Sequence, residues 1–153
     1  MISIDIQFKE ALHQYCLNST REKIKRLNDL LKSNLIDLNS ATKSTAGDKH
    51  ETARAMIHIE QDNHSRQLLE AQKIMNLLTQ INTKPKSFAQ AGALIKTNKG
   101  LFYIATGLGK VLINNNEVYV ISPGSPVGQK LLGSAPKDTV IFNKSNYYIE
   151  QVI

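Results

Sequence analysis

The sequence has a single cysteine and no long hydrophobic run, and both shortages exclude classes of protein. Cys16 cannot form a disulfide within the chain, which agrees with a reducing compartment. We interpret it as a packed thiol rather than a nucleophile, because apolar residues at helical spacing surround it. No apolar stretch approaches the roughly 18 residues that cross a bilayer, and the N-terminus has no basic segment before an apolar one. We therefore expect a cytoplasmic protein with no membrane partner.

The composition is that of an ordinary globular protein with an uneven charge. Hydrophobic residues make up 41% and charged residues 21% of the 153 positions, which suits one domain or two small ones. Residues 1–82 contain 11 basic and 10 acidic side chains, whereas residues 83–153 contain 8 and 3. The basic second half indicates an acidic partner surface or nucleic acid, although a soluble basic domain explains it equally well.

Proline and glycine are absent before Gly47, and the apolar residues there follow a helical period. They recur at steps of three and four over residues 8–38 and again over residues 53–81. A run of small polar residues interrupts the pattern just before Gly47. Two long helices joined by one short loop predict an antiparallel coiled-coil hairpin over residues 1–82, with its tip near residues 39–51.

One part of the second helical pattern is poor in apolar residues. It contains Glu60, Asn63, His64 and Gln67. Because little apolar area would be buried there, we expect the tip end of the hairpin to be the less stable end. His58 and His64 are six residues apart with no third ligand at metal-binding spacing. We therefore interpret these histidines as surface or seam residues.

Residues 83–153 change to the short period of β-strands. Six runs rich in β-branched and aromatic residues are separated by turn residues, and together they predict an antiparallel sheet. These runs are residues 93–96, 101–104, 110–113, 117–121, 139–142 and 147–149. Residues 126–132 can form one or two helical turns that end at Gly133 and cover one face of the sheet. The expected fold class is therefore α+β.

The sequence contains no recognisable arrangement for catalysis by this chain alone. It has no Ser/His/Asp order and no cofactor fingerprint, and residues 107–110 lack the first glycine and the Ser/Thr of a phosphate-binding loop. A prolyl isomerase is a weaker interpretation still, because the second half has no tryptophan and no evident apolar pocket. We do not expect a free-standing enzyme.

Asp48 and Glu51 stand at the start of the second helical pattern, directly after Gly47. Residues three apart on a helix share a face, so the two carboxylates could bind one cation together. From the spacing alone, capping and the helix dipole are the stronger explanation for acids in a first turn. Their place at the tip of a long hairpin favours presentation to another molecule, because capping does not require such an arm.

Two segments stand out as motifs: residues 121–133, ISPGSPVGQKLLG, followed by KDTV at 137–140, and residues 47–53, GDKHETA. Both resemble motifs of bacterial Gre transcript-cleavage factors. The first is similar to that family's C-terminal signature, and the second resembles its G-D-x-x-E-N-A motif at the coiled-coil tip. The resemblance implies a coiled coil that enters the secondary channel of bacterial RNA polymerase. It also implies an FKBP-like C-terminal domain, residues 83–153, that docks at the rim of the channel.

The resemblance also implies roles for particular residues. Asp48 and Glu51 would hold Mg²⁺, so that the polymerase cuts backtracked RNA at its 3′ end. Lys43, Lys49 and Arg54 would contact RNA or acidic groups of the channel. The docking residues would be Ser122, Pro123, Ser125, Pro126, Gly128, Leu131 and Gly133. The factor is expected to act as a monomer.

Three residues depart from the family's tip motif. Thr52, Arg54 and Ala55 stand where the family has asparagine, an acid and tyrosine. The alternative is therefore a regulator that occupies the channel without promoting cleavage. A helical-hairpin interaction module unrelated to polymerase is a third possibility.

Overall fold

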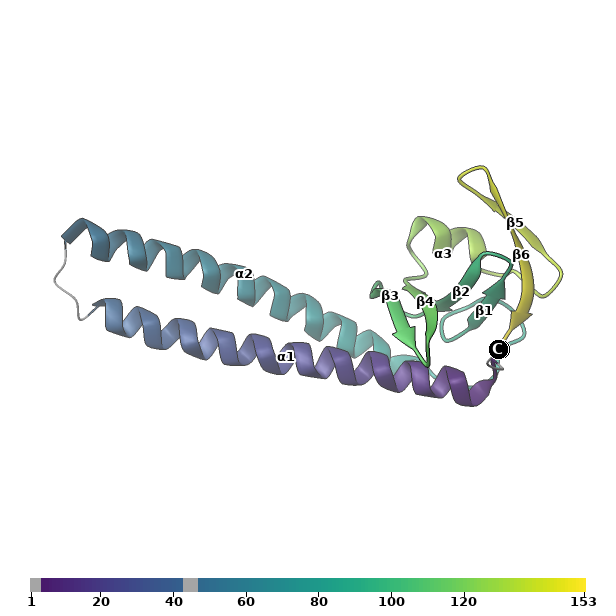
Figure 1. Ribbon diagram of the computed structural model, residues 1–153, viewed down its shortest axis with the longest axis horizontal. Coiled ribbons are helices and arrows are strands. Elements are labelled where there is room, and N and C mark those ends of the chain that lie inside the picture. Colours follow the sequence, from purple (N-terminus) through teal and green to yellow (C-terminus); the bar gives the residue numbers. More distant parts are fainter. Residues whose placement is uncertain (1–3, 43–46) are drawn as a thin grey trace. The chain divides into compact units, whose positions relative to one another are not determined.

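The computed structural model describes residues 4–42 and 47–153; for residues 41, 42 and 47–50 only the backbone is described. Two long helices come first, α1 (Ile6–Thr42) and α2 (Gly47–Gln80), and six strands with one short helix follow (Figure 1). The α+β class expected from the sequence is confirmed.

The chain divides into two compact units whose border crosses both long helices. The hairpin unit is Ser19–Met75, and the sheet unit combines Met1–Asn18 with Asn76–Ile153. The sequence placed a border at residues 82 and 83, where helix changes to strand. As a division into domains, that border stays a prediction.

The uninterrupted helical pattern explains the length of α1 and α2, which have 37 and 34 residues. At 1.5 Å per residue each helix is roughly 50 Å long. The carboxylate Oδ1 of Asp5 accepts a hydrogen bond from the backbone N–H of Phe8 at 2.9 Å, which caps the start of α1. Among the described residues, no helix combines the length and apolar character that spanning a membrane requires.

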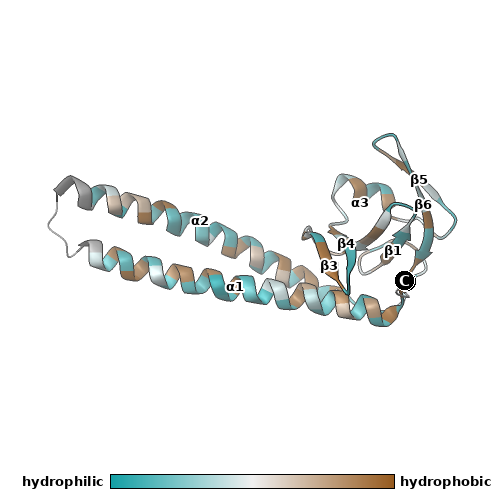
Figure 2. Cartoon of the chain, viewed as in Figure 1, coloured by the Kyte–Doolittle hydropathy of each residue, from teal (hydrophilic) through white to brown (hydrophobic). Residues whose placement is uncertain are grey.

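The helices of the hairpin unit show the periodicity of a coiled coil. Their buried and half-buried residues alternate in steps of three and four, which is the 3.5-residue repeat of two helices packed along a shared seam. The repeat consists of residues 20, 24, 27, 31, 34 and 38 of α1 and residues 57, 61, 64, 68, 71 and 75 of α2, and the half-buried residues 19 and 74 adjoin it at the border of the unit. Figure 2 shows hydrophilic and hydrophobic residues intermixed along both helices, as a narrow apolar seam requires.

The six strands form one sheet in the order β3-β4-β2-β1-β6-β5. Their bounds are β1 Leu94–Thr97, β2 Gly100–Ile104, β3 Gly109–Ile113, β4 Asn116–Ile121, β5 Thr139–Phe142 and β6 Ser145–Val152. The expectation of a wholly antiparallel sheet was wrong in one pair, because β2 and β4 are parallel. After β2 the chain passes to the edge as β3 and returns by a hairpin as β4, which enters the place beside β2.

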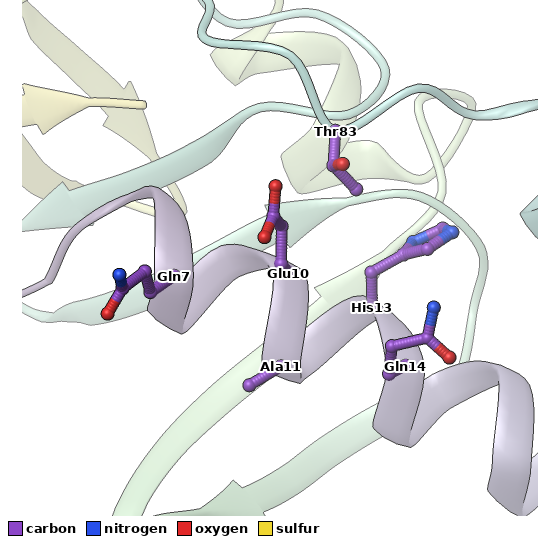
Figure 3. A pocket seen from close by; sticks show the side chains of 6 residues that line it. All are labelled: Gln7, Glu10, Ala11, His13, Gln14 and Thr83. Atoms are coloured by element: carbon purple, nitrogen blue, oxygen red, sulfur yellow. The ribbon is translucent and has the colours of Figure 1, made fainter.

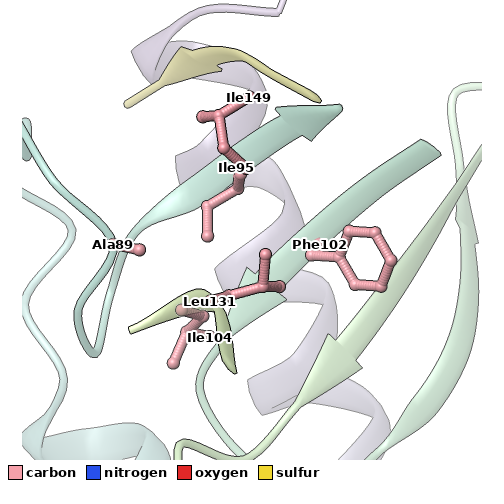
Figure 4. Close-up of a cluster of buried hydrophobic side chains, with 6 residues drawn as sticks. All are labelled: Ala89, Ile95, Phe102, Ile104, Leu131 and Ile149. Atoms are coloured by element: carbon pink, nitrogen blue, oxygen red, sulfur yellow. The ribbon is translucent and has the colours of Figure 1, made fainter. Parts of the chain in front are cut away.

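The short helix α3 (Pro126–Leu131) covers one face of the sheet, as the sequence predicted. Leu131 is fully buried and packs with side chains of three strands (Figure 4). The cluster consists of Ala89, Ile95, Phe102, Ile104, Leu131 and Ile149. This core holds α3 against the sheet.

Lys9 joins the first turns of α1 to the rest of the sheet unit. Its side chain is fully buried, and its Nζ donates hydrogen bonds to the backbone oxygens of Lys84, Gly92 and Ile153 at 3.0, 2.9 and 2.9 Å. Burial lowers the pKa of Lys9 to about 8, with a smaller contribution from nearby Lys86. The beginning of the chain is therefore fastened to segments that lie far away in the sequence.

Candidate functional site

Asp48 and Glu51 both lie in the first two turns of α2, beside the connection between the helices. Glu51 is exposed, whereas the side chain of Asp48 lies outside the described residues. Their spacing places the two positions on one face of the helix, and the helix dipole favours acids there. Binding of one metal ion by both carboxylates stays a prediction.

The basic residues predicted near the tip are only partly described. Lys43 lies outside the described residues, and for Lys49 only the backbone in α2 is described. Arg54 is exposed on α2, three residues after Glu51, so the two share a helix face. A cation therefore accompanies the described carboxylate at this end of the hairpin.

The described residues contain no group of three or more His, Cys, Asp or Glu that could hold a metal ion by itself. Two carboxylates are nevertheless the kind of ligand that Mg²⁺ prefers, because it takes few protein carboxylates and keeps oxygen ligands from water or substrate. A magnesium ion held by Asp48 and Glu51 and completed by a second molecule stays a prediction.

The predicted docking segment is built around a capped turn. Ser125 precedes α3, and its Oγ accepts a hydrogen bond from the N–H of Gly128 at 3.1 Å and donates one to the carbonyl of Ser122 at 2.8 Å. Pro126 occupies the first turn of α3, where a missing N–H costs nothing. A Cβ on Gly128 would overlap the carbonyl oxygen of Ser122, so only glycine fits there.

Two further residues of this segment also have structural roles. Leu131 is fully buried in the core, and Gly133 has a φ of +83°, which favours glycine after a helix. Pro126 and Leu132 are exposed, so they can contact a partner directly. Residues 121–133 thus contain side chains that determine the shape of the turn and, in Pro126 and Leu132, exposed side chains that a partner can contact.

One hollow of the sheet unit is lined mainly by polar residues. A cavity of about 390 Å³ is lined by Gln7, Glu10, Ala11, His13, Gln14 and Thr83 (Figure 3). His13 is already engaged, since its Nδ1 lies 2.8 Å from the hydroxyl oxygen of Tyr103 and a further hydrogen bond joins it to the backbone of Leu78. Burial lowers the pKa of His13, which favours the neutral ring. The imidazole of His13 is therefore committed to these contacts and is not free to act as a base in the cavity.

Cys16 has the properties expected of a packed thiol. It is fully buried, and burial raises its pKa to about 11. A thiol with so high a pKa is a poor nucleophile at neutral pH, because the thiolate is the reactive form. The structure thus agrees with the interpretation from the sequence.

Sequence reasoning missed an aromatic hollow on the sheet. A cavity of about 240 Å³ is lined by Lys99, Phe102, Tyr119, Val127, Phe142 and Tyr147. Phe102 and Tyr119 stack at 5.5 Å between ring centroids because they are paired in the parallel strands β2 and β4. The sequence pattern did not predict that pairing, so it could not bring these rings together. The cavity is smaller than typical cofactor sites.

The fold and the tip acids define a class of protein: a long helical hairpin joined to a small mixed sheet with one covering helix. No protein-family model matches the sequence, and no curated protein matches it significantly.

Solved structures that resemble the chain include two of one protein. The first is a crystal structure of GreA factor homolog 1 (Gfh1) of Thermus thermophilus, with 12% identity, a TM-score of 0.37, and coverage of 90% of this chain and 94% of that one. The second is a structure of the transcription factor Gfh1, with 13% identity, a TM-score of 0.39, and coverage of 90% and 92%. At this identity and these TM-scores, neither structure assigns a function to this chain.

Proposed function

We propose that this chain is a Gre-like factor that binds bacterial RNA polymerase through its secondary channel and stimulates cleavage of backtracked RNA. The observation that carries the proposal is the position of Asp48 and Glu51 in the first two turns of α2, at the end of a two-helix hairpin. Among the described residues, this end of the hairpin unit consists of α1 and α2, an arrangement that suits entry into a narrow channel. The match of residues 47–53 and 121–133 to Gre motifs supports the same function.

The two carboxylates would act as additional metal ligands at the polymerase. Mg²⁺, when bound, neutralises charge on the phosphate and lowers the pKa of a bound water. Asp48 and Glu51 would bind and orient the ion, and the helix would hold both in one geometry, which reduces the entropy cost of assembling the site. The polymerase and the RNA would complete the coordination shell. Arg54, Lys49 and Lys43 would then contact phosphates of the RNA 3′ end or acidic groups of the channel.

The sheet unit would provide the docking surface. The turn held by Ser125 and Gly128 presents Pro126 and Leu132 at the surface, and the excess of lysine in residues 83–153 favours an acidic partner. Binding through this unit would place the hairpin at the channel, while the tip acids would act on the RNA.

The decisive experiment uses a purified backtracked elongation complex with Mg²⁺. The wild-type chain is expected to shorten the RNA from its 3′ end, whereas Asp48→Asn/Glu51→Gln should bind the polymerase and leave the RNA intact. Asp62→Asn, a neutralised exposed acid elsewhere on α2, serves as the control and should cleave like the wild type. Equal RNA patterns with the wild type and the double variant would refute the cleavage role.

A regulator that occupies the channel without cleavage is the second candidate. Arg54, exposed three residues after Glu51, favours it, because a cation on the same helix face competes for the carboxylate. This candidate predicts binding to polymerase, altered initiation or pausing, and competition with a cleavage factor, but no shortened RNA. Absence of polymerase subunits from a native co-purification would contradict both candidates and favour a hairpin module with another partner.

A further inference from the structure

Asn34 interrupts the apolar seam of the hairpin unit. It occupies a buried position of α1 between Leu31 and Leu38, and only 4% of it is exposed. Its Oδ1 accepts a hydrogen bond from Nδ1 of His64 at 2.8 Å, and its Nδ2 donates one to Oε2 of Glu60 at 3.4 Å. We call Asn34, Glu60 and His64 the polar layer. Both ends of the buried amide are thus satisfied by side chains of α2.

These hydrogen bonds form in only one alignment of the two helices. A shift by one heptad would bring Ala71 or Ile57 to the place of His64, since all three occupy equivalent seam positions. Neither replacement can donate a hydrogen bond to Oδ1 of Asn34. An unpaired buried carbonyl oxygen disfavours the shifted alignment by a factor of about 5 to 150. Apolar seam residues such as Leu31 and Leu38 discriminate less, because they pack acceptably against any apolar neighbour.

We propose that the polar layer fixes the register of the hairpin and thereby the axial position of Asp48 and Glu51 relative to α1. A shift of one heptad moves one helix by about 10 Å along the other, which would rebuild the end of the hairpin. Asn34, Glu60 and His64 are positioning residues, because they act on the tip acids through the helices. Only the consequence for cleavage rests on the proposed function; the register is a property of the chain alone.

The register can be measured as a distance between two spin labels. Ser33→Cys and Arg66→Cys place one label on an exposed position of each helix, and the buried Cys16 is protected from labelling. With the native polar layer, a single narrow distance is expected. Asn34→Leu should lower the ratio of native to shifted register by about 5- to 150-fold and add a second distance. Asn28→Leu, at an exposed position of α1, is the matched control and should keep one distance.

Two further measurements separate register from folding. The thermal midpoint of Asn34→Leu should stay at or above the wild-type value, because leucine adds apolar burial to the seam. The exchange Asn34→His/His64→Asn restores a polar pair across the seam and should recover the single distance. A single distance in Asn34→Leu, equal to that of the wild type, would overturn the proposal.

The consequence for the tip is tested in the cleavage assay. If the wild type shortens backtracked RNA, the activity of Asn34→Leu should fall in proportion to the shifted fraction and return in the exchange variant. Full cleavage activity in a variant whose spin-label distance shows a shifted register would overturn the positioning role of the polar layer. If the wild type shows no cleavage, the proposed function fails, and the distance measurement still decides whether the polar layer fixes the register.

Discussion

Replacement of Lys9 tests whether the buried ammonium fastens α1 to the sheet unit. Lys9→Met keeps the apolar stem but leaves the carbonyl oxygens of Lys84, Gly92 and Ile153 without this donor. The bond to Gly92 is fully buried, and loss of such a partner costs about 1–3 kcal/mol. The other two bonds are partly buried and contribute roughly 0.5–1.5 kcal/mol each. The three bonds together contribute about 2–6 kcal/mol, and because removal of the ammonium also relieves its desolvation, we expect a smaller net loss of about 1–4 kcal/mol.

The assay is urea unfolding followed by near-UV circular dichroism of tyrosine. All five tyrosines belong to the sheet unit, so the signal reports on the unit that contains Lys9. Lys25→Met, an exposed lysine of the same helix, controls for the loss of charge and should change stability by less than about 0.5 kcal/mol. Equal stability of the two variants would refute the assignment of a stabilising role to the three hydrogen bonds.

The same variant gives a pH dependence with a defined sign. The folded-state pKa of Lys9 is about 8, below its ordinary value of 10.5, so between these values the unfolded chain holds the proton that the folded chain has released. Stability contributed by Lys9 is therefore constant below pH 8 and rises between pH 8 and 10.5. The wild type should gain about 1 kcal/mol relative to Lys9→Met from pH 7 to pH 9. No relative gain over this range would show that the folded-state pKa of Lys9 is not lowered to about 8.

Three further predictions concern the sheet unit. Gly128→Ala should lower the stability of the sheet unit by about 1–3 kcal/mol in urea unfolding, because the added Cβ overlaps backbone atoms. The control is Gly124→Ala, whose Cβ meets no atom within 4 Å and which should have little effect. Equal effects of the two substitutions would contradict the close approach at Gly128. Tyr103→Phe should lower the free energy of unfolding by about 1–2 kcal/mol, because Nδ1 of His13 loses its buried partner. An unchanged unfolding midpoint would show that this hydrogen bond does not contribute to stability. Cys16 should react with a thiol reagent only as fast as the sheet unit unfolds, as its thiol is buried with a pKa of about 11; rapid labelling of the folded protein at pH 7 would refute this.

Local periodicity was sufficient to predict the helices. Steps of three and four among apolar residues are a property of neighbouring residues, so α1 and α2 could be located before any tertiary contact was known. The short α3 was predictable for the same reason, because Ser125, Pro126 and Gly133 are local capping signals. Both successes concern interactions that span only a few residues.

The candidate site was predictable only in part. The sequence indicated that Asp48 and Glu51 share a helix face, which α2 confirms for the backbone. The sequence also indicated a region poor in apolar residues around His64. It did not indicate that His64 forms a hydrogen bond to Asn34 on the other helix. That bond joins residues 30 positions apart, and its existence depends on the alignment of two helices. Periodicity within one helix contains no information about that alignment.

The amino-acid sequence by itself specified the elements: the helices, the strands, the turn before α3 and the acids that open α2 all follow from short-range preferences. Tertiary structure alone decided that β4 enters beside β2 in parallel, that Phe102 therefore meets Tyr119, and that Lys9 is buried. A lysine at a helical position is normally a surface residue. Lys9 is buried because three backbone oxygens from distant segments converge on its ammonium, and such convergence exists only after the chain has folded.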